Sequence, residues 1–390
     1  MSDTGTDEPH GDRPQESELL PPAALAERVA MLSTAGADIR GGTLPMWGRL
    51  RTPPRRSWAA RFFAGSVFGA AWCGVLCLLA VALLRVCWHD GNVLLTWLNA
   101  FTLYLYLPAY LVLALAAWTH RWWLATASAA VVAFHLAWIA PDFQPATQFV
   151  PPTANPIAEP RSLRIFYANV LGSNRQFEAM LNEAASTNPD VIVLSELHRP
   201  WVSYLRESEV IKAFPYGTNV QKRHYGDTNV FSRLPVSRMR VIYIAGRVIL
   251  SVDIQVEEQA VRLYMIHSPR PMLQSMAEYE DFWNQLEPLV NSDRGPVVVI
   301  GDFNATQHSE VYRRLTSGRL RSAHVDRGRG YATTWPNWRR PVPPIRIDQA
   351  LVSDEVECIS IAEGMGPGSD HKPLILDIRI HSDTPAASEN

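Results

Sequence analysis

The feature that most constrains this chain is a series of three apolar segments, each without a charged residue. They run over Phe62–Leu84, Val93–Trp118 and Trp122–Ala140. Each approaches or exceeds the roughly 20 residues that an α-helix needs to cross a hydrocarbon core. A buried helical hairpin of a soluble protein is the alternative, but soluble cores rarely contain three such segments in succession. We therefore predict a three-helix transmembrane region over residues 58–140, with the lipid bilayer as a partner.

Positive charge predicts the orientation of these helices. Five arginines precede the first segment, namely Arg49, Arg51, Arg55, Arg56 and Arg61. The loop around residues 89–92 has no Lys or Arg, apart from Arg85 at the helix end. The positive-inside rule then places the N-terminus in the cytoplasm and everything after Ala140 outside. The expected location is the cell membrane, with several crossings.

The flanking segments are polar and irregular. Residues 1–57 are rich in Pro, Gly, Ser, Asp and Glu, which predicts a disordered cytoplasmic tail, and residues 381–390 predict a second one. Residues 141–160 contain six prolines and predict a semi-rigid linker. A net charge of −2 does not indicate a polyanionic partner. Only one of the four cysteines lies in the C-terminal half, so no disulfide framework is expected there.

Residues 161–380 predict an α/β domain, because short apolar runs alternate with helical patterns. The expected strands are Leu163–Ala168, Val191–Leu194, Val241–Ile244, Val261–Ile266, Val297–Ile300 and Leu374–Ile380. The expected helices are Phe177–Ala185 and Met272–Val290. In the second helix, Met272, Met276, Tyr279, Phe282 and Leu286 recur at helical spacing and are expected to face the core.

Polar residues recur where the predicted strands end. Glu196 follows DVIVL, His267 follows RLYMI, and Asp302 and Asn304 follow VVVI. Others of this kind are Asn169, Asp348, Asp370 and His371. One acidic residue at a strand end is usually a turn former or helix cap. A whole set is different, since strand ends on one edge of a sheet converge in space.

These residue types suit phosphoester cleavage. Glu196 and Asp370 offer the oxygen ligands that Mg²⁺ prefers, and no HExxH or CxxC indicates zinc. His267 and His371 can donate to a phosphate oxygen or transfer a proton. Asp302 and Asn304 can point together at an attacking water. A non-enzymatic membrane receptor or scaffold is the alternative, but it would not need this complete set.

GDFN at 301–304, RID at 346–348 and SDH at 369–371, with Glu196 upstream, resemble the endonuclease/exonuclease/phosphatase superfamily. The resemblance implies a four-layered α/β sandwich of the DNase I type and a Mg²⁺ cofactor, with Mn²⁺ as the alternative. It implies that Glu196, Asp370 and Asn169 belong to the metal site. It further implies catalytic roles for His267 near the phosphate, Asp302 and Asn304 at the water, and Asp348 orienting His371. Leu171 stands where abasic-site endonucleases have a metal-binding aspartate.

The whole arrangement resembles the VanJ-type membrane proteins linked to glycopeptide resistance. That resemblance implies a lipid-linked phosphoester substrate such as undecaprenyl pyrophosphate. An extracytoplasmic nuclease or other phosphodiesterase is the alternative, with nucleic acid as partner. Arg-rich stretches at 319–330 and 338–346 are compatible with either, since arginine binds any phosphate. The sequence does not fix the oligomeric state.

Overall fold

The computed structural model describes residues 58–148, 161–218, 227–271, 275–338 and 341–381. The predicted tail at 1–57 and all but the first residue of the tail at 381–390 lie outside this part. The N-terminal part of the described chain, up to Phe143, is helical. Its elements are α2 (Trp58–Trp88), α3 (Val93–Ala100), α4 (Thr102–Leu105), α5 (Leu107–Trp118), α6 (Trp122–Ile139) and the 3-10 helix η1 (Ala140–Phe143). Two helical segments, Phe62–Trp88 and Trp122–Phe143, are long and apolar enough to cross a membrane, and a third exists if a bent pair counts as one span.

The bent pair lies where the sequence predicted one continuous span. α3 makes an angle of 74° with the helical segment Thr102–Trp118. Polar side chains inside the apolar run explain the break. The Asn99 amide donates to Asp90 Oδ1 at 2.7 Å, and the Thr96 hydroxyl donates to the Asp90 carbonyl at 3.2 Å. These hydrogen bonds fold α3 back onto the preceding loop. Mean hydropathy does not reveal such a bend.

The rest of the chain forms two mixed six-stranded sheets. The first has the order β11 (Val356–Glu363), β12 (Leu374–Ile380), β1 (Arg161–Asn169), β2 (Val191–Ser195), β4 (Asn229–Ser232), β3 (Tyr216–Gly217). The second has the order β5 (Val236–Ile244), β6 (Arg247–Val256), β7 (Gln259–His267), β8 (Val297–Asp302), β10 (Asp348–Ser353), β9 (Leu320–Ser322). The pairs β1/β2 and β7/β8 are parallel, and the other pairs are antiparallel.

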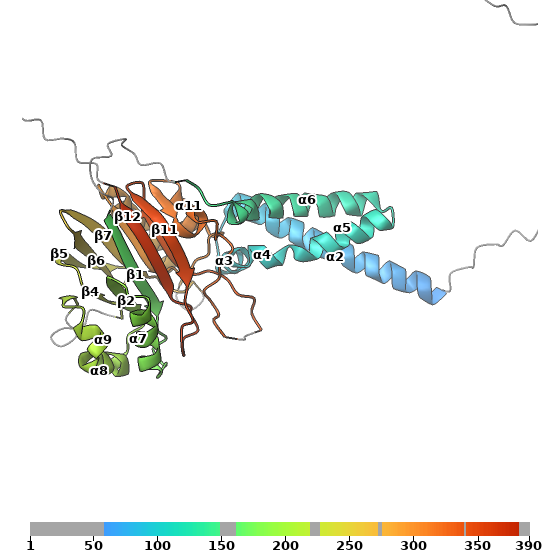
Figure 1. Cartoon of the computed structure of the whole chain (residues 1–390). Helices are drawn as coiled ribbons and strands as arrows, with labels where there is room; N and C mark the ends of the chain where they lie inside the picture. Colours follow the sequence, from blue (N-terminus) through green and yellow to red (C-terminus); the bar gives the residue numbers. More distant parts are fainter. Residues whose placement is uncertain (1–57, 149–160, 219–226, 272–274, 339–340, 382–390) are drawn as a thin grey trace, which may run out of the picture. The chain divides into compact units, whose positions relative to one another are not determined.

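Buried side chains divide the domain into helix, sheet, sheet and helix layers. Between the sheets lies the largest apolar cluster, which includes Ile165, Leu263 and Leu376. The outer face of the first sheet is covered by α7 (Phe177–Ser186), α8 (Arg199–Glu207) and α9 (Glu209–Lys212), seen in green in Figure 1. The outer face of the second sheet is covered by α10 (Met276–Ser292) and α11 (Glu310–Thr316). The predicted α/β class is confirmed.

The predicted core face of α10 is confirmed where it is described. Tyr279, Phe282 and Leu286 are fully buried, and Met276 packs against the same cluster. Met272 lies outside the described residues.

The first part of the predicted linker is not a free spacer. Asp142 is buried, and its carboxylate lies 3.1 Å from His308 Nε2. The Thr147 amide donates to the Asp326 carbonyl at 2.9 Å. Residues 141–148 therefore pack on the α/β domain, because a buried carboxylate needs a partner and His308 supplies one. Residues 149–160 lie outside the described part.

Candidate active site

Strand register brings the predicted polar residues to one edge of the two sheets. Asp302 ends β8, beside His267 at the end of the parallel strand β7. Asp348, which begins the antiparallel strand β10, lies on the other side of Asp302. In the first sheet, Asn169 pairs with Ser195, and Glu196 follows directly. The convergence expected of the strand ends is therefore present.

Local backbone shape aims these side chains. A Cβ at Gly301, whose φ is 152°, would lie 1.9 Å from the Ile266 carbonyl oxygen, so only glycine lets β8 run this close to β7. Glu196 and Asn304 adopt left-handed φ values of 59° and 44°. Such values are uncommon for non-glycine residues and often occur at functional sites. They turn each residue away from the strand that precedes it.

Asn169 links the carboxylates from the two sheets. Its Nδ2 donates to Glu196 Oε1 at 3.0 Å and to Asp302 Oδ2 at 3.1 Å, and all three residues are buried. Burial raises the pKa of Glu196, but the Asn169 hydrogen bond and the nearby His267 and Arg270 outweigh it and lower the pKa. Glu196 is thus held as a carboxylate. The amide oxygen of Asn169 accepts from the Leu171 amide at 3.1 Å, so its role as a metal ligand stays a prediction.

His371 and Asp348 form a buried pair. His371 Nδ1 lies 2.8 Å from Asp348 Oδ2, and His371 Nε2 lies 3.8 Å from Asp302 Oδ2. Burial lowers the pKa of His371, but the Asp348 and Asp302 carboxylates outweigh it and raise the pKa to about 9. Burial also raises the pKa of Asp302. Asp302 is therefore suited to accept a proton, and His371 to donate a hydrogen bond.

A second histidine–aspartate pair contains a residue that the sequence analysis missed. His267 Nδ1 lies 2.6 Å from Asp227 Oδ2, and His267 Nε2 lies 3.8 Å from Glu196 Oε1. Burial lowers the pKa of His267, but its hydrogen bond to Asp227 outweighs this and the pKa is raised. Asp227 precedes strand β4 rather than following a strand. A search for acidic residues at both ends of strands would have found it.

Arg270 was also missed, and it contacts the predicted metal carboxylate. Its Nη2 lies 2.6 Å from Glu196 Oε1. Asp370 accepts from Trp335 Nε1 at 3.2 Å, and its Oδ1 lies 4.0 Å from His371 Nε2. The Asn304 amide donates to the Ser268 carbonyl at 3.1 Å. Asp370 and Asn304 thus border the cluster.

The donor set fits a divalent cation. Among the described residues, two groups have ligand atoms within 4.8 Å of one another: Glu196, His267 and Asp302, and Asp302, Asp348 and His371. Asp370, predicted as a ligand, belongs to neither group. His267 and His371 contribute ring nitrogens to these groups, and Glu196 and the aspartates contribute carboxylate oxygens. Glu196, which is held as a carboxylate, offers the oxygen ligand that suits Mg²⁺ or Mn²⁺.

The Arg-rich stretches are largely used inside the domain. Arg319 pairs with Glu355 at 2.6 Å and Arg321 with Asp354 at 2.8 Å. Arg346 is buried and donates to the Gly330 carbonyl at 2.7 Å. Residues 339–340 lie outside the described part. These arginines are therefore held within the domain, and the stretches favour neither a lipid phosphate nor a nucleic acid.

Comparison with known proteins gives one family and a set of distant structures. A model of the "Endonuclease/Exonuclease/phosphatase family" matches residues 166–371. No curated protein matches. Solved structures include an endonuclease/exonuclease/phosphatase from Beutenbergia cavernae, with 18% identity over 57% of this chain and 72% of that one, and a TM-score of 0.43. D. rerio TDP2 complexed with a single-strand DNA product shares 19% identity over 56% of this chain and 98% of that one, with a TM-score of 0.46. A family protein from Bacteroides thetaiotaomicron shares 14% identity over 58% of this chain and 100% of that one, with a TM-score of 0.44.

Proposed function

Because the chain belongs to the endonuclease/exonuclease/phosphatase family, whose members are metal-dependent hydrolases of phosphoester bonds, we propose that it hydrolyses a lipid-linked phosphate or pyrophosphate. Undecaprenyl pyrophosphate is the proposed example, as in the VanJ-type group. The proposed location is the outer face of the cell membrane, with the N-terminus in the cytoplasm. The apolar helices of the same chain support this choice, because a site tethered to a bilayer meets lipid headgroups at high effective concentration.

The observation that carries the hydrolytic proposal is the convergence of Glu196, Asp302 and the two histidines at one edge. A bound Mg²⁺, or alternatively Mn²⁺, would be held chiefly by Glu196 and would neutralise charge on the phosphate oxygens. His267 and His371 would donate hydrogen bonds to those oxygens, since the pKa of each is raised.

Asp302 is the group best placed to take a proton from the attacking water. Burial raises its pKa, and its Oδ1 is oriented by the Asn304 backbone amide at 2.9 Å. The water oxygen forms a bond to phosphorus as the bond from phosphorus to the leaving oxygen breaks. The water proton passes to Asp302, and the leaving oxygen takes its proton from solvent.

The test is hydrolysis by the full chain in detergent, with Mg²⁺ or with EDTA. The substrates are undecaprenyl pyrophosphate, a phospholipid, plasmid DNA and a water-soluble phosphodiester. We expect EDTA-sensitive hydrolysis, and we expect Glu196→Gln to lower it at least about 100-fold, on the scale of a lost electrostatic contact to the transition state. Glu209→Gln removes a matched but exposed ion pair with Lys212 and is the control. Cleavage of DNA alone would favour the nuclease, and full activity of Glu196→Gln would refute the site.

A further inference from the structure

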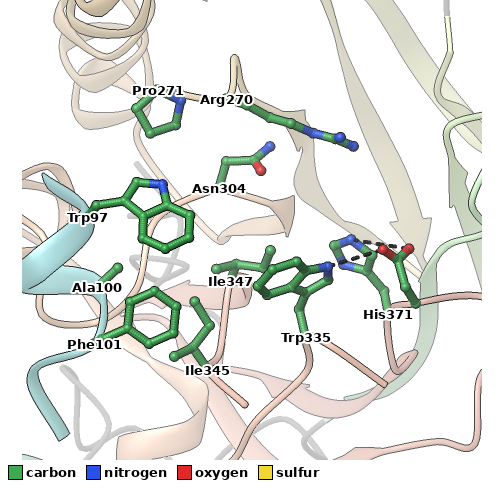
Figure 2. A pocket seen from close by; sticks show the side chains of 11 residues that line it. Trp97, Ala100, Phe101, Arg270, Pro271, Asn304, Trp335, Ile345, Ile347 and His371 are labelled. Atoms are coloured by element: carbon green, nitrogen blue, oxygen red, sulfur yellow. Dashed lines mark hydrogen bonds and ion pairs between the residues drawn. The ribbon is translucent and has the colours of Figure 1, made fainter. Parts of the chain in front are cut away.

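A cavity of about 280 Å³ opens beside the proposed catalytic residues, and its lining changes character from one end to the other. At one end lie Arg270, Asn304 and His371. Beyond Trp335 the wall becomes apolar, as Figure 2 shows from right to left. The far end is formed by α3 and the residue that follows it, within the N-terminal helical part of the chain.

The wall at this end is formed by Trp97 and Ala100 of α3 and by Phe101, which directly follows α3. Trp97 and Phe101 line the cavity, with ring centroids 5.2 Å apart. Ile345 and Ile347 lie between these rings and Trp335 in Figure 2. Carbon atoms thus line a continuous path from α3 to the catalytic edge.

Hydrogen bonds fix α3 and its neighbours against the α/β domain. Asp90 Oδ2 accepts from the Glu310 amide at 2.6 Å, and its other oxygen accepts from Asn99 of α3. At the end of α2, Arg85 Nη2 donates to the His308 carbonyl at 3.0 Å. The Tyr104 hydroxyl donates to the Pro344 carbonyl at 2.8 Å, next to Ile345. The break between α3 and α4 therefore places an apolar wall at the site, which a straight span could not do.

We propose that this cavity holds the first carbons of a hydrocarbon chain joined directly to the reacting phosphate, and that Trp97 and Phe101 determine this specificity. The inference rests on the proposed function and adds the chemical class of the substrate. A phosphate between Arg270 and His371 places the atoms attached to it against Trp335 and Ile347. An apolar wall offers no hydrogen bonds to a sugar or a glycerol ester, so either would lose its hydration without compensation.

The same wall explains how a substrate whose hydrocarbon chain is anchored in a bilayer can reach a site in the water-facing domain. A hydrocarbon chain that crossed water to reach the phosphate position would expose each methylene, at a free-energy cost that rises with the length exposed. The path along α3 keeps the leading carbons in apolar surroundings. Glycerophospholipids share the phosphate and the chain, but place polar ester groups where this cavity is apolar.

Short alkyl p-nitrophenyl phosphates, used as dissolved monomers, test the proposal on the full chain in one fixed detergent. From methyl to hexyl, kcat/KM should rise by up to about fourfold for each methylene that enters the cavity, and then level off. Trp97→Ala and Phe101→Ala should each lower the hexyl-to-methyl ratio of kcat/KM at least about tenfold. Leu94→Ala is the matched control, because Leu94 is on the same helix, is 66% exposed and does not line the cavity. A wild-type ratio near one, or a ratio unchanged in both aromatic variants, would overturn the proposal.

A binding measurement separates failure of this inference from failure of the proposed function. An alkyl phosphonate with a diazirine on its chain should label α3 at Trp97–Phe101, whether or not any ester is hydrolysed. Decyl phosphate should compete with this labelling at least about tenfold better than a lysophosphatidic acid of similar chain length. Labelling confined to other segments, or equal competition, would contradict the inference. Hydrolysis of no ester at all, with α3 labelled, would refute only the proposed function.

Discussion

Protonation of His324 should destabilise the loop that leads to Asp348, which is proposed to orient His371. His324, in α12 (Ala323–Asp326), is fully buried, and its Nε2 lies 3.2 Å from Glu363 Oε1. Arg329 also binds Glu363. Arg346 donates to the Gly330 carbonyl at 2.7 Å and to Gln349 Oε1 at 2.9 Å. This cluster fastens residues 327–338 and 341–347 to strands β10 and β11.

Burial, followed by the charge of Arg346, lowers the pKa of His324 from 6.5 to about 4. The unfolded chain therefore binds a proton between about pH 6.5 and pH 4 that the folded chain does not. The stabilising contribution is complete above pH 6.5 and is lost as the pH falls to about 4. At about 1.4 kcal/mol for each pKa unit, this amounts to about 3 kcal/mol, most of which is lost by pH 4.5.

The measurement is thermal unfolding of the full chain in non-ionic detergent at about pH 7.5 and about pH 4.5. His324→Gln is the matched variant, because glutamine keeps an N–H donor for Glu363 and does not titrate. A change of this size corresponds to roughly 5–10 °C in Tm for a domain of this size. Between the two pH values, the Tm of the wild type should fall by that much more than the Tm of His324→Gln. Equal losses in the two proteins would refute the argument.

Three further outcomes follow from the site and the helices. Asp227→Asn should lower kcat about 100-fold, because it misplaces His267. In a double-mutant cycle, the variant with both Asp227→Asn and His267→Asn should have a kcat close to that of His267→Asn alone. Arg270→Gln should tighten Mg²⁺ binding, measured by titration calorimetry, and should lower kcat. The reason is that the Arg270 guanidinium lies 2.6 Å from a carboxylate oxygen of Glu196 that the cation would use. Arg313→Gln, which breaks an exposed ion pair, should change neither the Mg²⁺ affinity nor kcat. Alkaline phosphatase fused to the C-terminus should be active, and green fluorescent protein in its place should be dark, if three spans carry the domain outside.

Strands with long apolar runs could be predicted from the sequence, including Val261–Ile266 with Arg262 and Leu374–Ile380 with Asp377, whereas the charged strands β6 and β11 could not. β2 and β8 are apolar along most of their length and buried throughout, so the sequence indicates them clearly. β6 contains Asp253, which pairs with Arg262 on β7 at 2.7 Å. Glu357 on β11 pairs with Arg379 on β12 at 3.2 Å. A charge that is neutralised by a neighbouring strand looks like a loop residue until the pairing is known.

The candidate site divides in a similar way. Residues that directly follow an apolar strand, such as Glu196 and Asp302, could be predicted because strand and site are adjacent in sequence. Asp227 was missed because it precedes its strand, and Arg270 could not be predicted because it is defined by a contact with Glu196 from another segment. Such contacts depend on the register between strands, which no single stretch of sequence contains.

Hydropathy separates the chain into membrane helices, linker and domain, and that separation hides the contacts among them. Asp90 lies between two apolar runs, and its carboxylate oxygens accept hydrogen bonds from Asn99 and from the backbone of Glu310, more than 200 positions apart. A buried carboxylate in such a place is costly unless it is fully hydrogen-bonded. Its two partners therefore favour one arrangement of α3 on the α/β domain over a freely rotating tether. The wall that α3 gives the cavity depends on this arrangement, so the proposed substrate selection and the proposed membrane attachment would be linked through the same few polar residues.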